Sequence, residues 1–492
     1  MPADTTPALD FLFKPRNIVL FEAKEKLFYF PKGLQKQQFP LDRLFLVSPT
    51  EKELFGLKCT KSFEDIPAKT IDLCILAVSR ERLLASMKEI LAKKTVKFFH
   101  IFTAGTSETD ELGIQIENEM QHLLRQNPGT HAIGPNCMGV YCPSGHNTYS
   151  EFFPTELGHI SAVCHSGDLH SKFILYGDIR HKLRLSKGAS VGNCLDLQVS
   201  DFLTYYNTDP DCDFIYVYFE GFSLLHPREG QQLVSVLRKM EKPVLFLRGG
   251  RTIRAQAAAK SHTGALGTSA QIWEGIYRQT HCIEAGTSLD DLIDIAYLFD
   301  HFFKRYRHLP ETQRLERFPT SKNALVIIWS GGLGVLDTDE LTEMGINLPL
   351  FDGEVKNNLM KILPVKVGSL SNPLDLPWIA GTDDYIKIVK TAISDKIDVV
   401  IVESDSSINW VVELHRKYYQ NLLKLKTHLE TLNKLLVIIL PEYGLPIRQE
   451  YYDQLIADGF IVYPSMRRAA KAFLALQIWG MRFKAFRNSK NK

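Results

Sequence analysis

The sequence lacks the features that would place it in a membrane or in the secretory pathway. No apolar run approaches the length of about 20 residues that a membrane-spanning helix needs. The opening stretch MPADTTPALDFLFKPRN has no basic segment followed by an apolar core, so it predicts no secretory signal. The 58 basic and 56 acidic residues leave a net charge of +2, which is too small to favour a nucleic-acid or membrane surface. We therefore expect a cytoplasmic protein that binds neither nucleic acid nor a membrane.

The spacing of a cysteine metal site is also absent. The chain has eight cysteines, and no two of them form the C-x-x-C pair that is typical of zinc sites. In a chain of 492 residues they are too sparse for a disulfide scaffold. The sequence therefore predicts neither a metal centre nor a disulfide framework.

Short apolar runs that alternate with amphipathic stretches are what the chain does contain. The segment RERLLASMKEILAKK (80–94) has the apolar spacing of a helix, and it separates two runs that are typical of buried strands. The strands expected in this first series cover residues 17–21, 43–50, 72–79, 98–105 and 131–140. Alternation of this kind predicts a parallel sheet with helices on both faces.

The same alternation begins again twice. A second series predicts strands at 159–167, 213–221 and 242–250 and a helix at 288–303. A charged linker (304–322) precedes a third series, with strands expected at 323–334, 396–405, 434–444 and 460–465. We therefore predict three consecutive α/β domains with doubly wound parallel sheets, at residues 1–145, 146–305 and 320–485.

Ligands on such sheets bind beyond the carboxyl ends of the strands, so the loops there are the places to look for chemistry. Four loops of the second domain carry polar residues: VCHSGDL (163–169), SVGN (190–193), YFEG (218–221) and KSHTGALG (260–267). Each has an ordinary explanation by itself. They are typical of a helix N-cap at Ser166, a tight turn, a solvated carboxylate at Glu220, and either a loop histidine or the start of a helix at His262.

Taken together, the four loops suit phosphoryl transfer. His262 stands among small residues in AAKSHTGALGTS, and small residues let another group approach closely. A neutral imidazole is a good nucleophile toward phosphorus near neutral pH, and Glu220 would fix its tautomer. The turn at Ser166 and Gly167 would offer backbone N–H groups and a helix N-terminus to the phosphoryl oxygens.

Motifs along most of the chain also occur in the order of a known family. They are KPRNIVLF, LFLVSPTEKELFGLKCTKSFEDIP, DLCILAVS, FTAGTSE, GPNCMGV, CHSGDL, SVGN, YFEG, the segment from GGR to SHTGAL, SGGLGVLDTD and NPLDL. GPNCMG and the pairing of GGR with SHTGA are the most specific. The chain resembles the α subunit of the NDP-forming acyl-CoA synthetases, the superfamily that includes succinyl-CoA synthetase and ATP-citrate lyase.

The resemblance implies a fold and a set of site residues. It implies an N-terminal Rossmann-like domain that binds coenzyme A, followed by two flavodoxin-like ligase domains. His262 looks like the family's phosphohistidine, with Glu220 as its orienting carboxylate. The phosphate-binding residues implied are Ser166, Gly167, Ser261, Thr263 and Gly264. The coenzyme A site implied is lined by Ser48, Pro49, Thr50, Val78, Ser79, Thr106, Glu108, Pro135, Asn136 and Cys137.

The resemblance also implies a reaction and a partner. In this family a small carboxylic acid, coenzyme A and a nucleoside triphosphate give acyl-CoA, the nucleoside diphosphate and phosphate, by way of an acyl phosphate. The nucleotide is bound by an ATP-grasp domain, and the sequence contains no segment that resembles one. We therefore expect an ATP-grasp β subunit that supplies ATP and Mg²⁺.

The chain departs from the family pattern in three places. Glu22 and Lys24, in IVLFEAKEK, stand where the family has a Gly-Ala-Ser loop against the phosphates of coenzyme A, and a carboxylate there would repel phosphate. His165 replaces a glutamine, and Asp168 adds a charge that would oppose a phosphoryl group at the same helix end. Glu22 and Asp168 keep one alternative open, a non-catalytic regulatory subunit that binds coenzyme A or a nucleotide. A second alternative, a coenzyme A-dependent ligase-lyase, is decided by no residue of the sequence.

Overall fold

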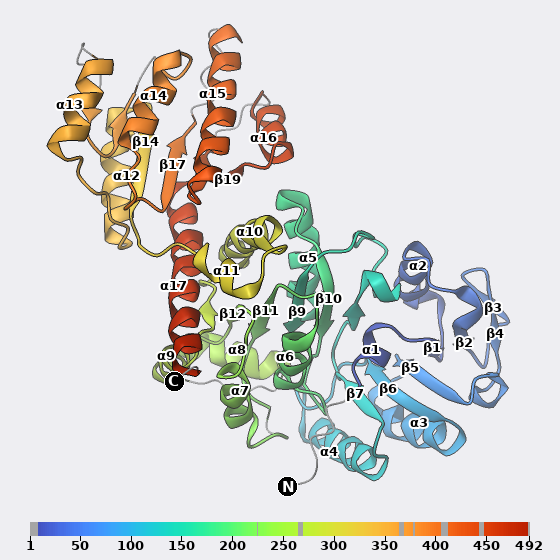
Figure 1. The fold of residues 1–492 in the computed structure, drawn as a ribbon. Coiled ribbons are helices and arrows are strands. Elements are labelled where there is room, and N and C mark those ends of the chain that lie inside the picture. The colour runs from blue at the N-terminus through green and yellow to red at the C-terminus, as the bar shows by residue number, and fades with distance from the viewer. Residues whose placement is uncertain are drawn as a thin grey trace. The chain divides into compact units, whose positions relative to one another are not determined.

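The computed structural model describes residues 8–223, 225–263, 269–363, 369–376, 379–404, 412–441 and 447–490. The chain divides into two compact units, Met1–Ile293 and Asp294–Lys492. The first unit holds two β-sheets and the second holds one, and helices flank each sheet (Figure 1). The predicted α/β class with three sheets is therefore confirmed.

The first sheet is Rossmann-like. Its strand order is β3-β4-β2-β1-β5-β6-β7, and all neighbours are parallel except the hairpin β3-β4. Without β3 this is the Rossmann order 3-2-1-4-5-6, whose switch point lies between β1 and β5. The strands are β1 (Ile18–Phe21), β2 (Leu44–Val47), β3 (Glu53–Leu54), β4 (Leu57–Thr60), β5 (Thr70–Leu76), β6 (Thr95–Ile101) and β7 (His131–Ile133). The helices are α1 (Asp10–Phe13), α2 (Tyr29–Lys36), α3 (Arg80–Lys93) and α4 (Glu111–Gln126).

Helix α3 shows how the local sequence positions these elements. Leu83, Met87 and Ile90 recur at helical spacing and are buried in one core cluster with Leu76 of the sheet. Ser79 precedes the helix with the extended backbone of an N-cap residue. The helix therefore starts at the carboxyl end of β5, beside the switch point of the first sheet.

The second sheet has the order β13-β12-β11-β9-β10-β8. Without β8, which runs antiparallel to β10, this is the flavodoxin order 2-1-3-4-5, with its switch point between β9 and β11. The strands are β8 (Val140–Tyr141), β9 (Ile160–Cys164), β10 (Leu185–Ser190), β11 (Phe214–Phe219), β12 (Val244–Arg248) and β13 (Ile283–Glu284). The helices are α5 (Gly167–His181), α6 (Val199–Thr208), α7 (Glu229–Leu237), α8 (Ile253–Thr263), α9 (Ala270–Gln279) and α10 (Leu289–Tyr306).

The third sheet repeats the flavodoxin order. It runs β15-β16-β14-β17-β18-β19, and only β15 is antiparallel to its neighbour. The strands are β14 (Ala324–Ile328), β15 (Ser369–Leu370), β16 (Leu374–Asp375), β17 (Val399–Glu403), β18 (Leu435–Ile439) and β19 (Ile461–Tyr463). The helices are α11 (Glu311–Glu316), α12 (Gly331–Glu343), α13 (Gly353–Ile362), α14 (Asp383–Ala392), α15 (Val412–Thr431), α16 (Ile447–Ala457) and α17 (Met466–Lys490).

Several segments differ from their predicted structure. The strand expected at 323–334 ends at Ile328, and its last residues begin helix α12, while strand β10 was not predicted. The single strand expected at 131–140 is two strands, β7 in the first sheet and β8 in the second, because Asn136 and the glycines around it adopt left-handed backbone angles between them. The expected linker 304–322 contains the end of α10 and all of α11. Helix α10 continues to Tyr306 because apolar side chains, including Phe302, recur there at helical spacing and are buried.

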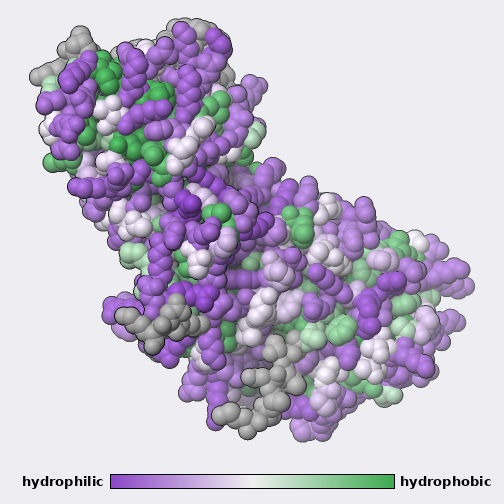
Figure 2. Space-filling view, viewed as in Figure 1, coloured by the Kyte–Doolittle hydropathy of each residue, from purple (hydrophilic) through white to green (hydrophobic). Residues whose placement is uncertain are grey.

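The described helices include none that is long and apolar enough to cross a bilayer. On the face shown in Figure 2, polar side chains predominate and apolar ones form small groups between them. All eight cysteines are free thiols, and only Cys59 is not buried.

Candidate active site

Four loops lie side by side at the carboxyl edge of the second sheet. Strands β12, β11, β9 and β10 are neighbours in this order and run parallel, so the loops that follow them meet at one edge. These loops contain, in order, Gly249 and Gly250, Glu220, Ser166 and Gly167, and the SVGN turn. The switch point falls between the loops of Glu220 and Ser166, which is where ligands of flavodoxin-like sheets bind.

The turn at Ser166 and Gly167 begins the 15-residue helix α5. The Ser166 hydroxyl accepts a hydrogen bond from the Leu169 N–H (3.3 Å), so this serine caps its own helix. A Cβ atom on Gly167 would lie 2.3 Å from the Met138 side chain, which shows how closely the turn approaches GPNCMG. The helix leaves its remaining first-turn N–H groups at this edge, where they can bind an anion.

Asp168 does not place its charge against this turn. Its side chain is 70% exposed, and the carboxylate accepts a hydrogen bond from Lys172 Nζ one helical turn later (2.6 Å). A solvated carboxylate paired with a lysine is screened from its neighbours. The repulsion of a phosphoryl group expected from the sequence is therefore largely removed by the direction of the side chain.

His165 supports the backbone of Glu220. Its ring is buried against Phe219, with ring centroids 4.6 Å apart, and its Nδ1 accepts a hydrogen bond from the Glu220 N–H (3.4 Å). An accepting Nδ1 places the proton of a neutral ring on Nε2. Sequence reasoning identified the substitution at 165 but not this contact, which joins two loops 55 residues apart.

Glu220 is buried rather than solvated. Its side chain lies at the end of β11 and is 5% exposed. A Cβ atom on Gly249 would lie 2.9 Å from the Tyr218 hydroxyl and, at ordinary van der Waals distance, 3.5 Å from Glu220 Cγ, so the loop after β12 passes close beside the end of β11. Burial, together with the charge of Glu220, raises the pKa of the neighbouring Tyr218. Burial favours the interpretation that the carboxylate is held for a purpose.

The segment around His262 is only partly described. The backbone of His262 lies in the last turn of α8, so the interpretation as the start of a helix is wrong. Alanine-rich IRAQAAAK has high helix propensity, which explains why the expected loop is a helix. The side chains of Ser261, His262 and Thr263, and all of Gly264, lie outside the described residues. Their contacts remain predictions.

The residues predicted to bind coenzyme A lie at the carboxyl edge of the first sheet, after β2, β5, β6 and β7. Pro49, Thr50 and Ser79 are exposed there. The side chains of Ser48, Val78, Thr106, Pro135 and Cys137 are buried, and those of Glu108 and Asn136 are partly exposed. The first three residues can contact a ligand with their side chains, whereas a buried residue can do so only through backbone atoms or by shaping its loop.

The two sheet edges are joined at the GPNC turn. The Gly134 N–H donates to the Val191 carbonyl (3.2 Å), and the Asn193 N–H donates to the Pro135 carbonyl (3.0 Å). Gly192 has a φ of +54°, and a Cβ atom there would lie 2.1 Å from the Pro135 carbonyl oxygen. The predicted coenzyme A loop and the SVGN turn therefore touch through their backbones.

Glu22 occupies a backbone position that favours glycine. Its φ is +53°, in the left-handed region, and the residue is 7% exposed. Its carboxylate forms ion pairs with Arg82 at the start of α3 and with Lys24 (4.0 Å). The loop after β1 thus keeps a glycine-like conformation, while a carboxylate and two cations lie beside the switch point. Arg82 was not identified from the sequence.

The loop after Glu220 ends at a second buried carboxylate. Glu229 is 2% exposed; its Oε2 accepts a hydrogen bond from the Ser223 N–H (2.7 Å), and its Oε1 is buried with no partner among the described residues. Burial, assisted by the charge of Asp201, raises the pKa of Glu229 to about 7. This carboxyl group therefore binds a proton more tightly in the folded chain than in the unfolded chain.

The Glu229→Gln variant is expected to be more stable than the parent protein at alkaline pH only. Since the folded-state pKa of Glu229 is raised, its stabilising contribution is complete below about pH 4.5 and is lost as the pH rises through 7. The neutral amide avoids this loss, so the variant should gain roughly 2 kcal/mol in unfolding free energy at pH 8 and almost nothing at pH 5. Urea unfolding at both pH values measures this; an equal difference at the two values would contradict it.

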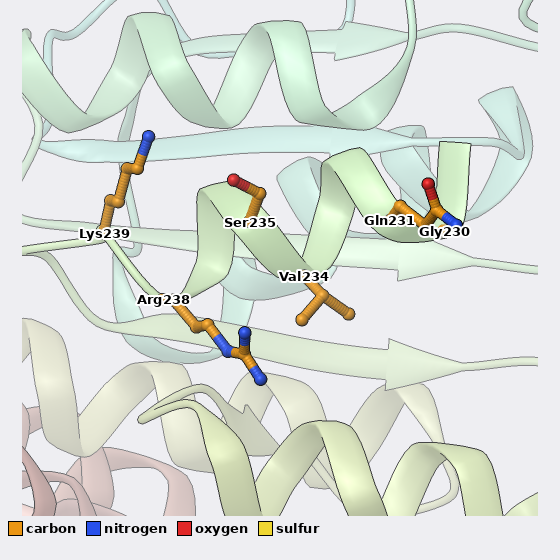
Figure 3. A pocket seen from close by; sticks show the side chains of 6 residues that line it. All are labelled: Gly230, Gln231, Val234, Ser235, Arg238 and Lys239. Carbon is orange, nitrogen blue, oxygen red and sulfur yellow. The ribbon is translucent and has the colours of Figure 1, made fainter. Parts of the chain in front are cut away.

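One surface hollow lies elsewhere on the second sheet's domain. It follows one face of α7 and is lined by Gly230, Gln231, Val234, Ser235, Arg238 and Lys239 (Figure 3). None of the predicted site residues lines it, and it holds no acidic or nucleophilic cluster. The hollow therefore adds nothing to the site at the sheet edge.

Comparison with known proteins agrees with this arrangement. Residues 31–143 match the family described as "CoA binding domain", and residues 157–299 match "Succinyl-CoA ligase like flavodoxin domain". The α subunit of acetate–CoA ligase (ADP-forming) II from Pyrococcus furiosus is 30% identical over 400 residues, which cover 80% of this chain and 81% of the relative. The chain belongs to the ADP-forming acyl-CoA synthetase family.

Other members of this family align over different shares of their length. The α subunit of acetate–CoA ligase (ADP-forming) I from Pyrococcus furiosus is 26% identical, over 96% of this chain and 98% of the relative. The acetate–CoA ligase (ADP-forming) of Methanocaldococcus jannaschii is 32% identical, over 68% of this chain but only 44% of the relative. Acetyl-coenzyme A synthetase 1 of Ca. Korarchaeum cryptofilum, solved with phosphate and ADP, has the same fold, with a TM-score of 0.76 at 23% identity over 97% of this chain and 98% of that one.

These comparisons establish an acyl-CoA ligase of the ADP-forming type with the organisation of an α subunit, and a CoA-binding domain at its N-terminus. The residues at the first sheet's edge suit coenzyme A in part. Exposed hydroxyl side chains and the cations Lys24 and Arg82 suit its phosphates, whereas Glu22 opposes them. The match to the CoA-binding family begins at residue 31, after this loop.

The Glu22→Gly variant of this synthetase is expected to bind coenzyme A more tightly, by about fivefold to 10³-fold. Removing the carboxylate removes a repulsion of roughly 1 to 4 kcal/mol at about 4 Å and releases Arg82 to pair with a phosphate. Glycine also adopts the left-handed backbone without strain. Calorimetric titration with coenzyme A measures the change. Glu25→Gln is the matched control, since Glu25 is exposed in the same loop. Weaker binding by Glu22→Gly than by the parent protein would contradict this account of the loop.

Proposed function

We propose that this chain is the α subunit of an acyl-CoA synthetase in which His262 carries phosphate during turnover. The observation that supports this most strongly is the adjacency, at a flavodoxin switch point, of the buried Glu220 and the Ser166–Gly167 turn. Helix α8, whose last turn contains His262, follows the neighbouring strand β12, across the loop that carries Gly249 and Gly250. A carboxylate, an anion-binding helix terminus and an imidazole are the groups that phosphoryl transfer through histidine requires.

Each residue then has a role. Glu220 accepts a hydrogen bond from the N–H of one imidazole nitrogen of His262, so that the proton stays on that nitrogen and the other keeps its lone pair for phosphorus. The N–H groups at the start of α5 stabilise the phosphoryl oxygens. In one direction, phosphorus leaves the carboxylate oxygen of an acyl phosphate and bonds to the imidazole, which releases the acid; the reverse step forms the acyl phosphate.

Coenzyme A binding fits the edge of the first sheet. Thr50 and Ser79 would contact the ligand there, and the contact between the GPNC and SVGN turns would bring its thiol near the anion turn. The thiol sulfur attacks the acyl carbon of the acyl phosphate; the C–O bond to phosphate breaks, and the thiol proton leaves with the phosphate product. This geometry requires only that the two sheet edges meet, as their backbone hydrogen bonds show.

A separate chain supplies the nucleotide in this proposal. The Methanocaldococcus jannaschii relative is matched over 44% of its length, whereas the relative named as the α subunit of ligase I is matched over 98%. The unmatched part of the longer relative would correspond to an ATP-grasp β subunit that binds ATP and Mg²⁺. A small carboxylic acid is the remaining substrate.

Labelled acetyl phosphate tests the proposal without the partner. The full-length chain incubated with ³²P-acetyl phosphate should acquire a phosphate that is stable in base and labile in acid, as phosphohistidine is. Addition of acetate should remove the label. If acetyl, propionyl and butyryl phosphate all leave the chain unlabelled, the enzymatic proposal is wrong. A chain that binds coenzyme A but never takes phosphate would match the regulatory alternative, which the carboxylate of Glu22 favours.

A further inference from the structure

The carboxylates of Glu108 and Glu117 both contact the side-chain amide of Asn193, which belongs to the SVGN turn where the two sheet edges meet. Glu108 belongs to the loop after β6 and Glu117 to α4. The Asn193 side-chain Nδ2 lies 2.7 Å from Glu108 Oε2 and 2.8 Å from Glu117 Oε1. Glu117 is 1% exposed and Asn193 is 4% exposed. In the part of the chain that the structure describes, neither carboxylate forms an ion pair with a lysine or arginine.

The number of donor hydrogens in this cluster limits which of the close contacts are hydrogen bonds. Nδ2 also lies 3.1 Å from the Thr106 hydroxyl and 3.3 Å from the Ser107 hydroxyl, but an amide has only two N–H hydrogens. Each hydroxyl donates its own hydrogen to Glu117, at 2.6 Å from Thr106 and 2.9 Å from Ser107. Both amide hydrogens are therefore left for the carboxylates. A residue without these donors would leave two carboxylates, one of them buried, facing each other.

This cluster connects the SVGN turn of the second sheet to the loop 105–108 of the first sheet, and the proposed chemistry needs both in fixed positions. Asn193 ends the SVGN turn of the second sheet, and its N–H also holds the Pro135 carbonyl. The carboxylate of Glu108 accepts hydrogen bonds from Gly105 N (2.6 Å) and Thr106 N (3.0 Å), so it fixes the backbone of its own loop. Helix α4 also packs closely against this loop: a Cβ atom on Gly113 of α4 would lie 2.1 Å from the Thr106 carbonyl oxygen.

We propose that Asn193 is a positioning residue that holds the loop 105–108 in the place where it meets coenzyme A. The residue reaches this loop from the turn beside the phosphate-binding helix terminus, so it couples the coenzyme A loop to the phosphate site through one amide. This inference rests on the proposed function and extends it. Loss of the amide should weaken coenzyme A binding and slow the coenzyme A-dependent step, while phosphate loading at His262 continues.

Reversal of polarity tests the proposal. Asn193→Asp keeps the shape of the side chain but replaces its donor with a third carboxylate. The dissociation constant for coenzyme A should rise at least tenfold in calorimetry, while labelling by ³²P-acetyl phosphate stays within about twofold of the parent protein. Adding Glu117→Gln to Asn193→Asp restores two carboxylates and one amide in the cluster. This double variant should recover coenzyme A affinity to within about threefold of the parent value.

Two further variants keep the test interpretable. Asn127→Asp is the matched control, since the Asn127 side chain donates only to the Leu123 carbonyl of its own helix (2.8 Å) and should leave coenzyme A binding unchanged. Ser107→Ala removes one donor of the cluster and should raise the dissociation constant about threefold, even if Asn193→Asp does not fold. Equal losses of labelling and coenzyme A affinity, or no rescue by Glu117→Gln, would overturn the proposal. If the parent protein takes no label but these affinities change as stated, only the proposed function fails.

Discussion

The His262→Asn variant is expected to take no phosphate from acetyl phosphate and to lose acyl-CoA synthesis by on the order of 10³-fold or more, because His262 is the group that accepts phosphorus in the proposed mechanism. The Glu220→Gln variant should still be labelled, but about 10²- to 10⁴-fold more slowly. In that mechanism the carboxylate of Glu220 fixes the tautomer of the imidazole, and a neutral amide would do so less well. Rapid-quench labelling of both variants with ³²P-acetyl phosphate measures these rates.

A second histidine provides the control for this experiment. His122 is exposed on α4, where it pairs with Gln126 of the same helix, and His122→Asn should be labelled like the parent protein. The two substitutions at the site also separate chemistry from folding. Glu220→Gln keeps the volume of the buried side chain, so its thermal midpoint should change little while its rate falls. Undiminished labelling of His262→Asn would show that the phosphate is carried elsewhere.

The Gly192→Ala variant is expected to destabilise the first compact unit by about 3 to 5 kcal/mol and to disrupt the junction between the two sheets. The left-handed backbone of Gly192 alone costs an alanine about 1 kcal/mol. The larger cost is steric, because the new Cβ atom would lie 2.1 Å from the Pro135 carbonyl oxygen and 2.5 Å from that of Asn136. Both contacts are backbone atoms, which cannot rotate away, so the two turns must separate.

The Gly56→Ala variant measures the cost of the left-handed backbone separately from the steric cost. Gly56 also has a left-handed φ, +74°, but a Cβ atom there would meet nothing within 4 Å. It should therefore cost only about 1 kcal/mol. Thermal unfolding of both variants measures the difference, and calorimetry should show weakened coenzyme A binding for Gly192→Ala alone. Equal destabilisation by the two variants would mean that the contact between the turns contributes little.

Much of the fold follows from local patterns. Apolar runs such as ISAVC (160–164) and FIYVYF (214–219) are buried along their length or nearly so, which is why they predicted strands of a parallel sheet covered on both faces. The position of polar residues after these strands predicted the edge at which Ser166 and Glu220 lie. The prediction failed where one run serves two sheets, at 131–140, because the break depends on backbone angles that hydrophobicity does not encode.

For the candidate site the sequence predicts a list of residues but not the surroundings of their side chains. Asp168 and Glu22 both follow the ends of strands, yet one faces solvent beside Lys172 and the other is buried between Arg82 and Lys24. Their sequences give no sign of this difference. The contact of His165 with Glu220 joins positions 55 residues apart, so it depends on the pairing of β9 with β11.

The sequence by itself determined the class of fold, most of the central strands and the loops in which chemistry was to be sought. These properties depend on the spacing of apolar and small residues over a few turns, and such spacing is local. Only the tertiary structure decided which polar groups share a buried cluster, as Asn193 and Glu117 do across 76 residues. Hydrogen-bond partners at that separation are chosen by the packing of whole sheets, because a buried donor must find its acceptor wherever the fold brings one.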